Sequence, residues 1–392
     1  MLERATDSPA AGTQSNIGLR SGNQMLAEGA LQAGCRFFAG YPITPASGIF
    51  KTMIDRLPAV GGIALSAPDE ISAIAYCIGA SMRGFKAMTA TSGPGWALMT
   101  ESVQYALMTE TPLVVAMVQR LGPSTGGATQ GAQGDVLFTE YCTSGGYTIP
   151  VLCPTNAREC YELSLLAFDW AEELRTPVIL LSDKEVGMTT ESVDYATLSK
   201  RTGAIRKSVP DEASKLANGD AGTYYYRTRA EIPLFTPVAG AMKVTATGSA
   251  HNKQGLLQKN SPETLDVLVH LEEKIRARAD TLSVVYSDLL PDAVTLVISY
   301  GVTARAARQA VASARAAGKK VSLLIIYSLF PVPISMVNIA LEETTRVIVA
   351  EENLNGLYRA VITPLCKERQ IIGINKIGSM ITPAEILASI LR

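Results

Sequence analysis

Short apolar runs alternate along much of the chain with stretches in which apolar residues recur at helical spacing. This alternation predicts parallel strands that are crossed by helices. In the first half of the chain, the expected strands are residues 36–40, 87–91, 113–118, 149–152 and 178–181. The expected helices are residues 22–33, 71–82, 96–108 and 157–173. The pattern therefore predicts an α/β protein built on a doubly wound parallel sheet.

A second set of alternating elements lies near the C-terminus. Strands are expected at 294–300, 321–327, 346–351 and 374–377, and helices at 304–316, 355–366 and 383–391. Between about 190 and 288 the alternation stops, apart from one long helix from Pro262 to about Ala279. We expect a connector that packs on a neighbour there, because a structureless insert of that length is uncommon in a compact domain. The predicted division is a flexible tail at 1–15, a first domain at 16–190, the connector at 191–287 and a smaller α/β domain at 288–392.

Composition and charge exclude several classes of protein. Of the 392 residues, 47% are apolar, which excludes a largely disordered chain. A formal net charge of −1 argues against a polybasic protein that binds nucleic acid. No apolar run approaches the ~18 residues that a membrane-spanning helix needs, and the first residues lack the apolar core of a secretory signal. We therefore expect a cytoplasmic protein with no membrane partner.

The cysteines indicate what the chain is expected not to carry. It has six cysteines and two histidines, and no two cysteines form a C-x-x-C pair. The sequence therefore signals no metal site and no iron–sulfur cluster on this chain. Most cysteines lie among apolar neighbours, where reduced thiols behave as small hydrophobic groups. Any chemistry must depend on carboxylates, arginines, hydroxyls or a bound cofactor.

Two turns follow predicted strands directly. The first, Gly40-Tyr41-Pro42-Ile43-Thr44-Pro45, contains two prolines that fix the backbone. Thr44 is placed to present its hydroxyl to an anion, although the turn alone favours a simple helix cap. The second turn, Ser92-Gly93-Pro94-Gly95, has glycines that let the backbone approach a ligand at the start of a helix. By itself, such a sequence is more often a plain tight turn.

Charged residues mark two further positions. Asp69 and Glu70 open the helix predicted at 71–82, where acids normally complement the helix dipole; the alternative is a carboxylate used for proton transfer. Arg120 follows a buried strand, where its guanidinium suits a carboxylate or a phosphate. A surface arginine on a turn explains the pattern equally well. The glycine-rich residues 122–127 that follow are a candidate lid.

In this order and spacing, the segments resemble the alpha subunit of 2-oxoacid:ferredoxin oxidoreductases, most closely those of the 2-oxoglutarate type. The matching residues are 40–45, Asp69-Glu70 with Ile74 and Gly79-Ala80-Ser81, 91–95, 108–112, Gln119-Arg120 with 122–126, Gln133-Gly134-Asp135, 175–183, and Glu351-Glu352-Asn353 with Gly356. The resemblance is strong over residues 20–190 and moderate over 290–392.

The resemblance implies a fold and a set of cofactors. Residues 16–190 would form the domain that binds the aminopyrimidine end of thiamine diphosphate, and 288–392 would be similar to the C-terminal domain of transketolases. A partner beta subunit would hold the diphosphate, Mg and a [4Fe-4S] cluster. No extra domain precedes residue 20, so we expect the gamma domain on another polypeptide, together with a delta subunit, ferredoxin and an (alpha–beta)₂ core.

The resemblance also assigns residues and a reaction. Glu70 would be the catalytic carboxylate on the pyrimidine N1′, Thr44 and Arg120 would hold the substrate carboxylate, and Tyr41, Pro42, Ser92 and Gly93 would complete the cofactor site. The expected reaction is oxidative decarboxylation of 2-oxoglutarate with CoA to succinyl-CoA, CO₂ and reduced ferredoxin, or the reverse carboxylation. Pyruvate, a branched-chain or an aryl 2-oxoacid is the alternative substrate. A non-catalytic scaffold subunit of the same fold is the alternative of another class, against which the retained Thr44, Glu70 and Arg120 argue.

Overall fold

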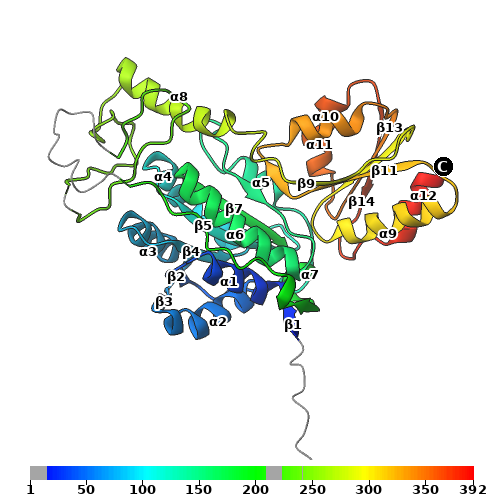
Figure 1. Ribbon diagram of the computed structural model, residues 1–392, viewed down its shortest axis with the longest axis horizontal. Helices are drawn as coiled ribbons and strands as arrows, with labels where there is room; N and C mark the ends of the chain where they lie inside the picture. Colours follow the sequence, from blue (N-terminus) through cyan, green and yellow to red (C-terminus); the bar gives the residue numbers. More distant parts are fainter. Residues whose placement is uncertain (1–15, 209–222, 241) are drawn as a thin grey trace, which may run out of the picture.

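The computed structural model describes residues 16–208, 223–240 and 242–392 (Figure 1). The tail predicted at 1–15 lies outside the described residues. A seven-stranded sheet forms the centre of the N-terminal part, in the order β12-β6-β7-β5-β4-β2-β3. Its parallel strands are β2 (Phe37–Gly40), β3 (Ile63–Ser66), β4 (Ala87–Thr91), β5 (Leu113–Gln119), β6 (Val151–Leu152) and β7 (Pro177–Asp183).

Helices cover both faces of this sheet because successive strand residues point to opposite sides. Val114, Ala116 and Val118 of β5 pack with α1 (Gly22–Gln32), α2 (Ser47–Arg56) and α6 (Ala157–Leu174). The alternate residues of β5, such as Val115 and Met117, pack with α3 (Glu70–Met82) and α4 (Gly93–Met108). The strand is buried along its whole length, which explains its continuous apolar run.

The C-terminal part contains a five-stranded sheet in the order β14-β13-β10-β11-β9. Its strands are β9 (Val285–Asp288), β10 (Thr295–Ser299), β11 (Val321–Ile326), β13 (Arg346–Glu351) and β14 (Gln370–Asn375), with β9 alone antiparallel to its neighbour. One face carries α9 (Thr303–Ala316) and α12 (Pro383–Leu391), and the other α10 (Ile334–Leu341) and α11 (Leu357–Cys366). The last strand therefore lies earlier than the expected 374–377, because Ile371 and Ile372 pair with Val347 and Ile348.

Short elements tie the two sheets together. β12 (Ser328–Phe330) follows β11 but crosses to the N-terminal sheet, where it pairs antiparallel with β6. A separate pair, β1 (Ile17–Ser21) with β8 (Thr190–Asp194), joins the beginning and the end of the first α/β segment. The remaining short helices are α5 (Val136–Glu140), α7 (Lys184–Met188) and the 3₁₀ turns Pro58–Val60 and Tyr195–Thr197. The domain boundaries given above stay a prediction.

The connector packs on this chain itself. Its long helix, α8 (Pro262–Arg276), lies above the N-terminal sheet (Figure 1). Tyr224 and Tyr226 are buried, and their rings lie 4.5 Å from the His251 ring and 3.9 Å from the His270 ring. These two tyrosines are therefore enclosed within the chain rather than presented to a partner.

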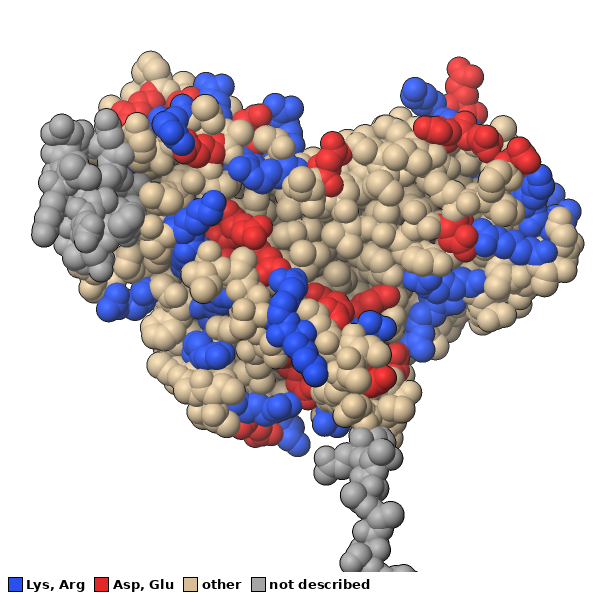
Figure 2. Space-filling model, in the orientation of Figure 1, with Lys and Arg blue, Asp and Glu red and all other residues tan. Residues whose placement is uncertain are grey.

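The surface and the thiols complete the picture. On the face shown in Figure 2, lysines and arginines are interspersed with acids rather than gathered in one basic patch. None of the helices in the described ranges is long and apolar enough to cross a membrane. All six cysteines are buried as free thiols, and burial raises the pKa of Cys35 and of Cys142 to about 12.

Candidate active site

The candidate residues gather at the carboxyl-terminal edge of the N-terminal sheet. Thr44 lies on the turn after β2, Glu70 begins the helix after β3, and Ser92 follows β4. Gln119 ends β5, and Arg120 comes directly after it. Because neighbouring strands are parallel and in register, their ends meet at one edge, where α/β sheets bind ligands.

Asp69 and Glu70 differ in orientation although they are adjacent. Asp69 caps α3, since its Oδ1 accepts a hydrogen bond from the Ser72 amide at 2.7 Å, and these bonds lower its pKa. Glu70 turns inward and is only 6% exposed. Its side chain has no hydrogen-bond or ionic partner among the described residues. The helix-dipole interpretation therefore fits Asp69, while Glu70 is a buried residue whose carboxylate has no partner in the described ranges.

The turn between β4 and α4 passes close to two carboxylates. A Cβ at Gly95 would lie 2.5 Å from Glu70 Oε1 and 2.2 Å from Thr91 Oγ1, so no side chain fits there. A Cβ at Gly93 would lie 3.0 Å from Asp135 Oδ1. The Ser92 hydroxyl is buried and has no partner in the described part of the chain. The glycines thus bring a helix N-terminus and an unpaired hydroxyl next to Glu70.

Arg120 is buried at 7% exposure, so the surface-arginine interpretation is wrong. Its Nη1 donates to the carbonyl oxygen of Thr44, and its buried Nε has no partner among the described residues. Thr44 does not cap α2: the cap residue is Ala46, without any side-chain hydrogen bond. The guanidinium therefore joins the ends of β2 and β5 and retains a free donor.

Tyr41 and Pro42 lie at the outside of this edge. Tyr41 is 39% exposed, and Pro42 is exposed as well. The roles of both residues in the cofactor site, like those of Ser92 and Gly93, stay predictions.

Asp135 is the residue at this edge to which sequence reasoning gave no role. It contacts Gly93, and its amide donates to Gln119 Oε1 at 3.2 Å. Its Oδ2 is buried without a partner in the described ranges. Burial raises the pKa of Asp135 to about 7, although the positive charge of Arg120 acts against this shift. The motif Gln133-Gly134-Asp135 was part of the family resemblance, but it did not indicate which of its residues faces the site.

Gln133, two residues earlier, attaches the loop to the C-terminal sheet. Its Nε2 donates to Asp183 Oδ2 at 3.0 Å, and its Oε1 accepts from the Glu352 amide at 2.8 Å. Asp183 also accepts from Gln119 at 2.7 Å and from the Val302 amide. The ends of β5 and β7 are thereby fixed against the start of α9. Gln119 bonds Asp135 directly, and Gln133 fixes the loop two residues before it.

These residues fit the aminopyrimidine end of thiamine diphosphate. An acid can bond the pyrimidine nitrogen of the cofactor only if no other group in the chain occupies it, and Glu70 meets that condition among the described residues. The glycines at 93 and 95 leave space that a Cβ would fill, and the Ser92 hydroxyl is free to bond. When bound, thiamine diphosphate supplies an electron sink for decarboxylation of a 2-oxoacid.

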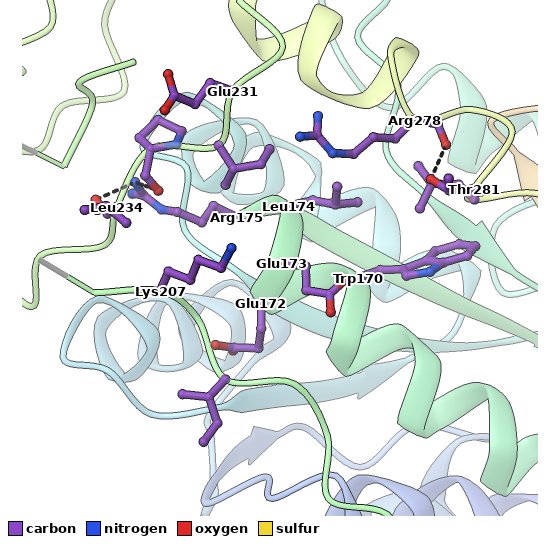
Figure 3. A pocket seen from close by; sticks show the side chains of 14 residues that line it. Trp170, Glu172, Glu173, Leu174, Arg175, Lys207, Glu231, Leu234, Arg278 and Thr281 are labelled. Carbon is purple, nitrogen blue, oxygen red and sulfur yellow. Dashed lines mark hydrogen bonds between the residues drawn. The ribbon is translucent and has the colours of Figure 1, made fainter. Parts of the chain in front are cut away.

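A cavity of about 620 Å³ lies elsewhere, between the end of α6, the connector and the end of α8 (Figure 3). Arg175, Lys207 and Arg278 line it together with Glu172, Glu173 and Glu231. Arg175 precedes the first residue of β7, so this cavity lies by the amino-terminal edge of the sheet, away from Glu70. Its size does not identify it as the site of the chemistry.

Comparisons with known proteins agree with the geometry. The family model described as pyruvate flavodoxin/ferredoxin oxidoreductase, thiamine diphosphate-binding, matches residues 28–270, and pyruvate:ferredoxin oxidoreductase core domain II matches 293–386. The 2-oxoglutarate synthase subunit KorA of Methanothermobacter thermautotrophicus is 38% identical over 95% of this chain and 97% of its own length. The ketoisovalerate oxidoreductase subunit VorB of the same organism is 30% identical over 91% of this chain and 92% of its own length.

A solved structure is similar as well. The 2-oxoglutarate:ferredoxin oxidoreductase of Magnetococcus marinus, solved with 2-oxoglutarate, coenzyme A and succinyl-CoA bound, matches with a TM-score of 0.89 at 29% identity. The match covers 100% of this chain and 68% of that one.

Proposed function

Because the chain belongs to the pyruvate flavodoxin/ferredoxin oxidoreductase family, we propose that it is the alpha subunit of a 2-oxoglutarate:ferredoxin oxidoreductase. The reaction is oxidative decarboxylation of 2-oxoglutarate with CoA to succinyl-CoA, CO₂ and reduced ferredoxin, or its reverse. One observation carries the proposal within the chain. Glu70 is buried at the carboxyl-terminal edge of the sheet without an internal partner, next to the glycine turn.

This observation favours a catalytic subunit over a scaffold. The Glu70 side chain bonds to no group in the described part of the chain, and a protein that only supports a neighbour gains nothing from an acid held in that way. The same holds for the buried, unpaired Nε of Arg120 and hydroxyl of Ser92. Glu70, proposed for the cofactor, and Arg120, proposed for the substrate carboxylate, therefore lie at the same edge of the N-terminal sheet.

The choice of 2-oxoglutarate rests on the relatives. The curated 2-oxoglutarate synthase subunits reach 36–38% identity, whereas the ketoisovalerate subunits reach 29–30%. Activity on a branched-chain 2-oxoacid is the second candidate, since those relatives also match most of the chain. Pyruvate and aryl 2-oxoacids complete the panel.

The proposal includes partners and a location. The relatives are named as subunits, which supports a complex of several chains. We propose that a beta subunit supplies the diphosphate and Mg site and the [4Fe-4S] cluster, that gamma and delta subunits and ferredoxin complete the system, and that the core is (alpha–beta)₂. The cytoplasmic location stays a prediction.

Turnover of the purified complex tests this function. The chain is co-expressed with its neighbouring subunits, and viologen reduction is measured with CoA and each 2-oxoacid in turn. We expect the highest kcat/KM with 2-oxoglutarate and a strict requirement for thiamine diphosphate. A higher kcat/KM with a branched-chain 2-oxoacid would transfer the assignment to the second candidate. Absence of turnover with every 2-oxoacid would refute the proposal.

A further inference from the structure

Asp135 has a buried oxygen that the fold itself does not use. It occupies the cap position of α5, but its side chain makes no capping hydrogen bond. Its Oδ2 has no partner among the described residues. Buried polar atoms in native proteins almost always find a partner, so an unpaired one calls for an explanation. A role in starting the helix does not provide it here.

The surroundings of Asp135 place it in the space where a substrate anion would bind. Its carboxylate lies against Gly93, at the start of α4. Its amide is bonded to the side chain of Gln119, the residue before Arg120. Arg120 has an unused Nε, and its charge acts on Asp135 without forming an ion pair within 4 Å in the described structure. Asp135 and Arg120 therefore each have an unpaired buried atom at the same edge of the sheet.

We propose that Asp135 is a specificity-determining residue of the substrate site, which donates a hydrogen bond to the 2-oxoacid when protonated and repels it when ionised. The proposal rests on the proposed function, since it needs an anionic 2-oxoacid beside Arg120. A carboxylic acid is a donor only in its protonated form, and an ionised one carries the same charge as the substrate. Asp135 therefore couples substrate affinity to pH.

The charged groups around Asp135 agree with a proton being held there. Arg120, at the end of β5, lowers its pKa, yet burial outweighs this effect and raises the pKa to about 7. From α4, the nearest residues are the uncharged Ser92 and Gly93, and Glu70 contacts Gly95 further along the turn. Asp183 at the end of β7 accepts a hydrogen bond from Gln119 Nε2, the other atom of the side-chain amide whose Oε1 accepts from the Asp135 amide. In the unfolded chain an aspartate has a pKa of about 3.9, so the folded site retains the proton to higher pH.

The test compares KM for 2-oxoglutarate at pH 6.0, 7.0 and 8.5 in the purified complex with its partner subunits. For the unmodified enzyme we expect KM to rise about tenfold from pH 6.0 to 8.5, because a hydrogen bond to a charged group is lost. Asp135→Asn keeps the size and a donor but does not titrate, so its KM should change less than twofold. Asp135→Leu removes the donor, and its KM should be high at every pH.

A matched control separates this effect from a general influence of buried acids. The pKa of Glu140 is raised to about 7 as well, by burial and by the charge of Glu272, and Arg120 is not among the groups that act on it. Glu140→Gln should therefore retain the pH dependence of the unmodified enzyme. Equal melting temperatures of the variants would show that each is folded.

Each outcome decides one of the two proposals. A KM that is independent of pH in the unmodified enzyme, or an Asp135→Asn variant that keeps the full pH dependence, would overturn the role of Asp135 alone. A change in kcat without a change in KM would also contradict it. If the unmodified complex oxidised no 2-oxoacid, the proposed function would fail, and the role of Asp135 would fail with it.

Discussion

At the scale of single residues, the start of α3 separates two acids that look equivalent in the sequence. Asp69 has an extended backbone and caps the helix, while Glu70 is the first helical residue and turns toward Gly95. A capping acid bonds the free amides of the first turn and stays near the surface. An acid one position later can turn inward, and this difference of one position separates a capping carboxylate from the one that we propose to be catalytic.

Glu70→Gln should lower kcat of the assembled enzyme by about 10²–10⁴, because it removes the ionisable partner of the cofactor and keeps the shape. The melting temperature should stay close to that of the unmodified protein. Asp69→Ala is the matched comparison: it should lower the melting temperature and leave kcat nearly unchanged. Normal turnover by Glu70→Gln would remove Glu70 from the catalytic role.

Arg120→Lys should raise KM for the 2-oxoacid strongly and affect thiamine diphosphate affinity little. Lysine keeps the charge, but it loses the planar fork that bonds the Thr44 carbonyl and leaves further donors for the proposed substrate carboxylate. Thr44→Val should raise KM less, since one neutral hydrogen bond contributes about 0.5–1.5 kcal/mol. Steady-state kinetics and cofactor titration measure both quantities; weakened cofactor binding with normal KM would reverse the assigned roles.

Much of this site could be predicted from the sequence, but only by comparing several motifs. The turns and Arg120 were correctly placed at strand ends, because buried parallel strands are continuous apolar runs that end at a definite residue. Local sequence rules favoured Thr44 as a helix cap, but it does not cap α2. They also could not decide whether Arg120 lies on the surface or faces the site, and the structure buries it. Asp135 was not assigned, because its contact with Gly93 joins two loops and no spacing in the sequence encodes it.

At the scale of elements, the connector is fixed to the first sheet by buried charges. Glu110 follows the end of α4, and its Oε2 lies 2.8 Å from Lys274 Nζ and 3.3 Å from His270 Nε2, both of α8. The side chains of all three residues are almost completely buried. Burial alone would raise the pKa of Glu110, but Lys274 and His270 outweigh it and lower the pKa below its usual value. These buried interactions explain how α8 is held against the N-terminal part although the connector lacks alternating strands and helices.

Lys274→Met should destabilise the protein by about 3–5 kcal/mol, because it leaves the Glu110 charge buried without its main partner. The double variant Glu110→Gln/Lys274→Met should recover most of that loss. Denaturant unfolding measures the free energies and the coupling between the two sites. If the single variant were as stable as the unmodified protein, the buried Glu110–Lys274 ion pair would have no role in docking α8.

The elements that the sequence did not predict share a physical cause. β3 lies at the edge of its sheet and has only four, mostly exposed residues, so its apolar run of three residues is too short to indicate a strand. β12 has three residues, too few to produce any periodicity, and its pairing with β6 depends on the distant fold. The central strands and long helices, in contrast, were predicted because burial on one or both faces leaves a pattern in the residues themselves.

At the scale of the whole molecule, carboxyls lie where the two sheets meet. Burial raises the pKa of Asp183 and of Glu352 to about 7 each, although hydrogen bonds from Val302 and Ile381 act in the opposite direction. Folded-state values above the unfolded ones mean that the folded protein binds more protons between about pH 4 and 7. The stability that these two carboxyls contribute is therefore fully present below their unfolded pKa and is lost as pH rises through their folded pKa.

The melting temperature should therefore fall as pH rises from about 6 to 8. Glu352→Gln should flatten this dependence, because glutamine still accepts the bond from the Ile381 amide but does not ionise. Calorimetric scans at several pH values measure the effect, and Glu385→Gln is the control, since that exposed acid has a pKa lowered to about 2. A melting temperature that rises over this interval would contradict the raised values at the junction.

No group of histidines, cysteines and acids that could hold a metal ion is found in the part of the chain that the structure describes. The residues proposed for the pyrimidine side of the cofactor lie around Glu70, and the six cysteines are buried as free thiols. The proposed beta subunit would carry the iron–sulfur cluster that accepts electrons from the 2-oxoacid. We expect the purified single chain to be colourless, to hold no iron and to reduce no viologen with 2-oxoglutarate and CoA. Addition of the beta subunit should restore turnover in proportion to complex formed, as followed by iron analysis and size-exclusion chromatography. Stoichiometric iron in the single chain, or turnover without a partner, would show that the site is complete within this polypeptide.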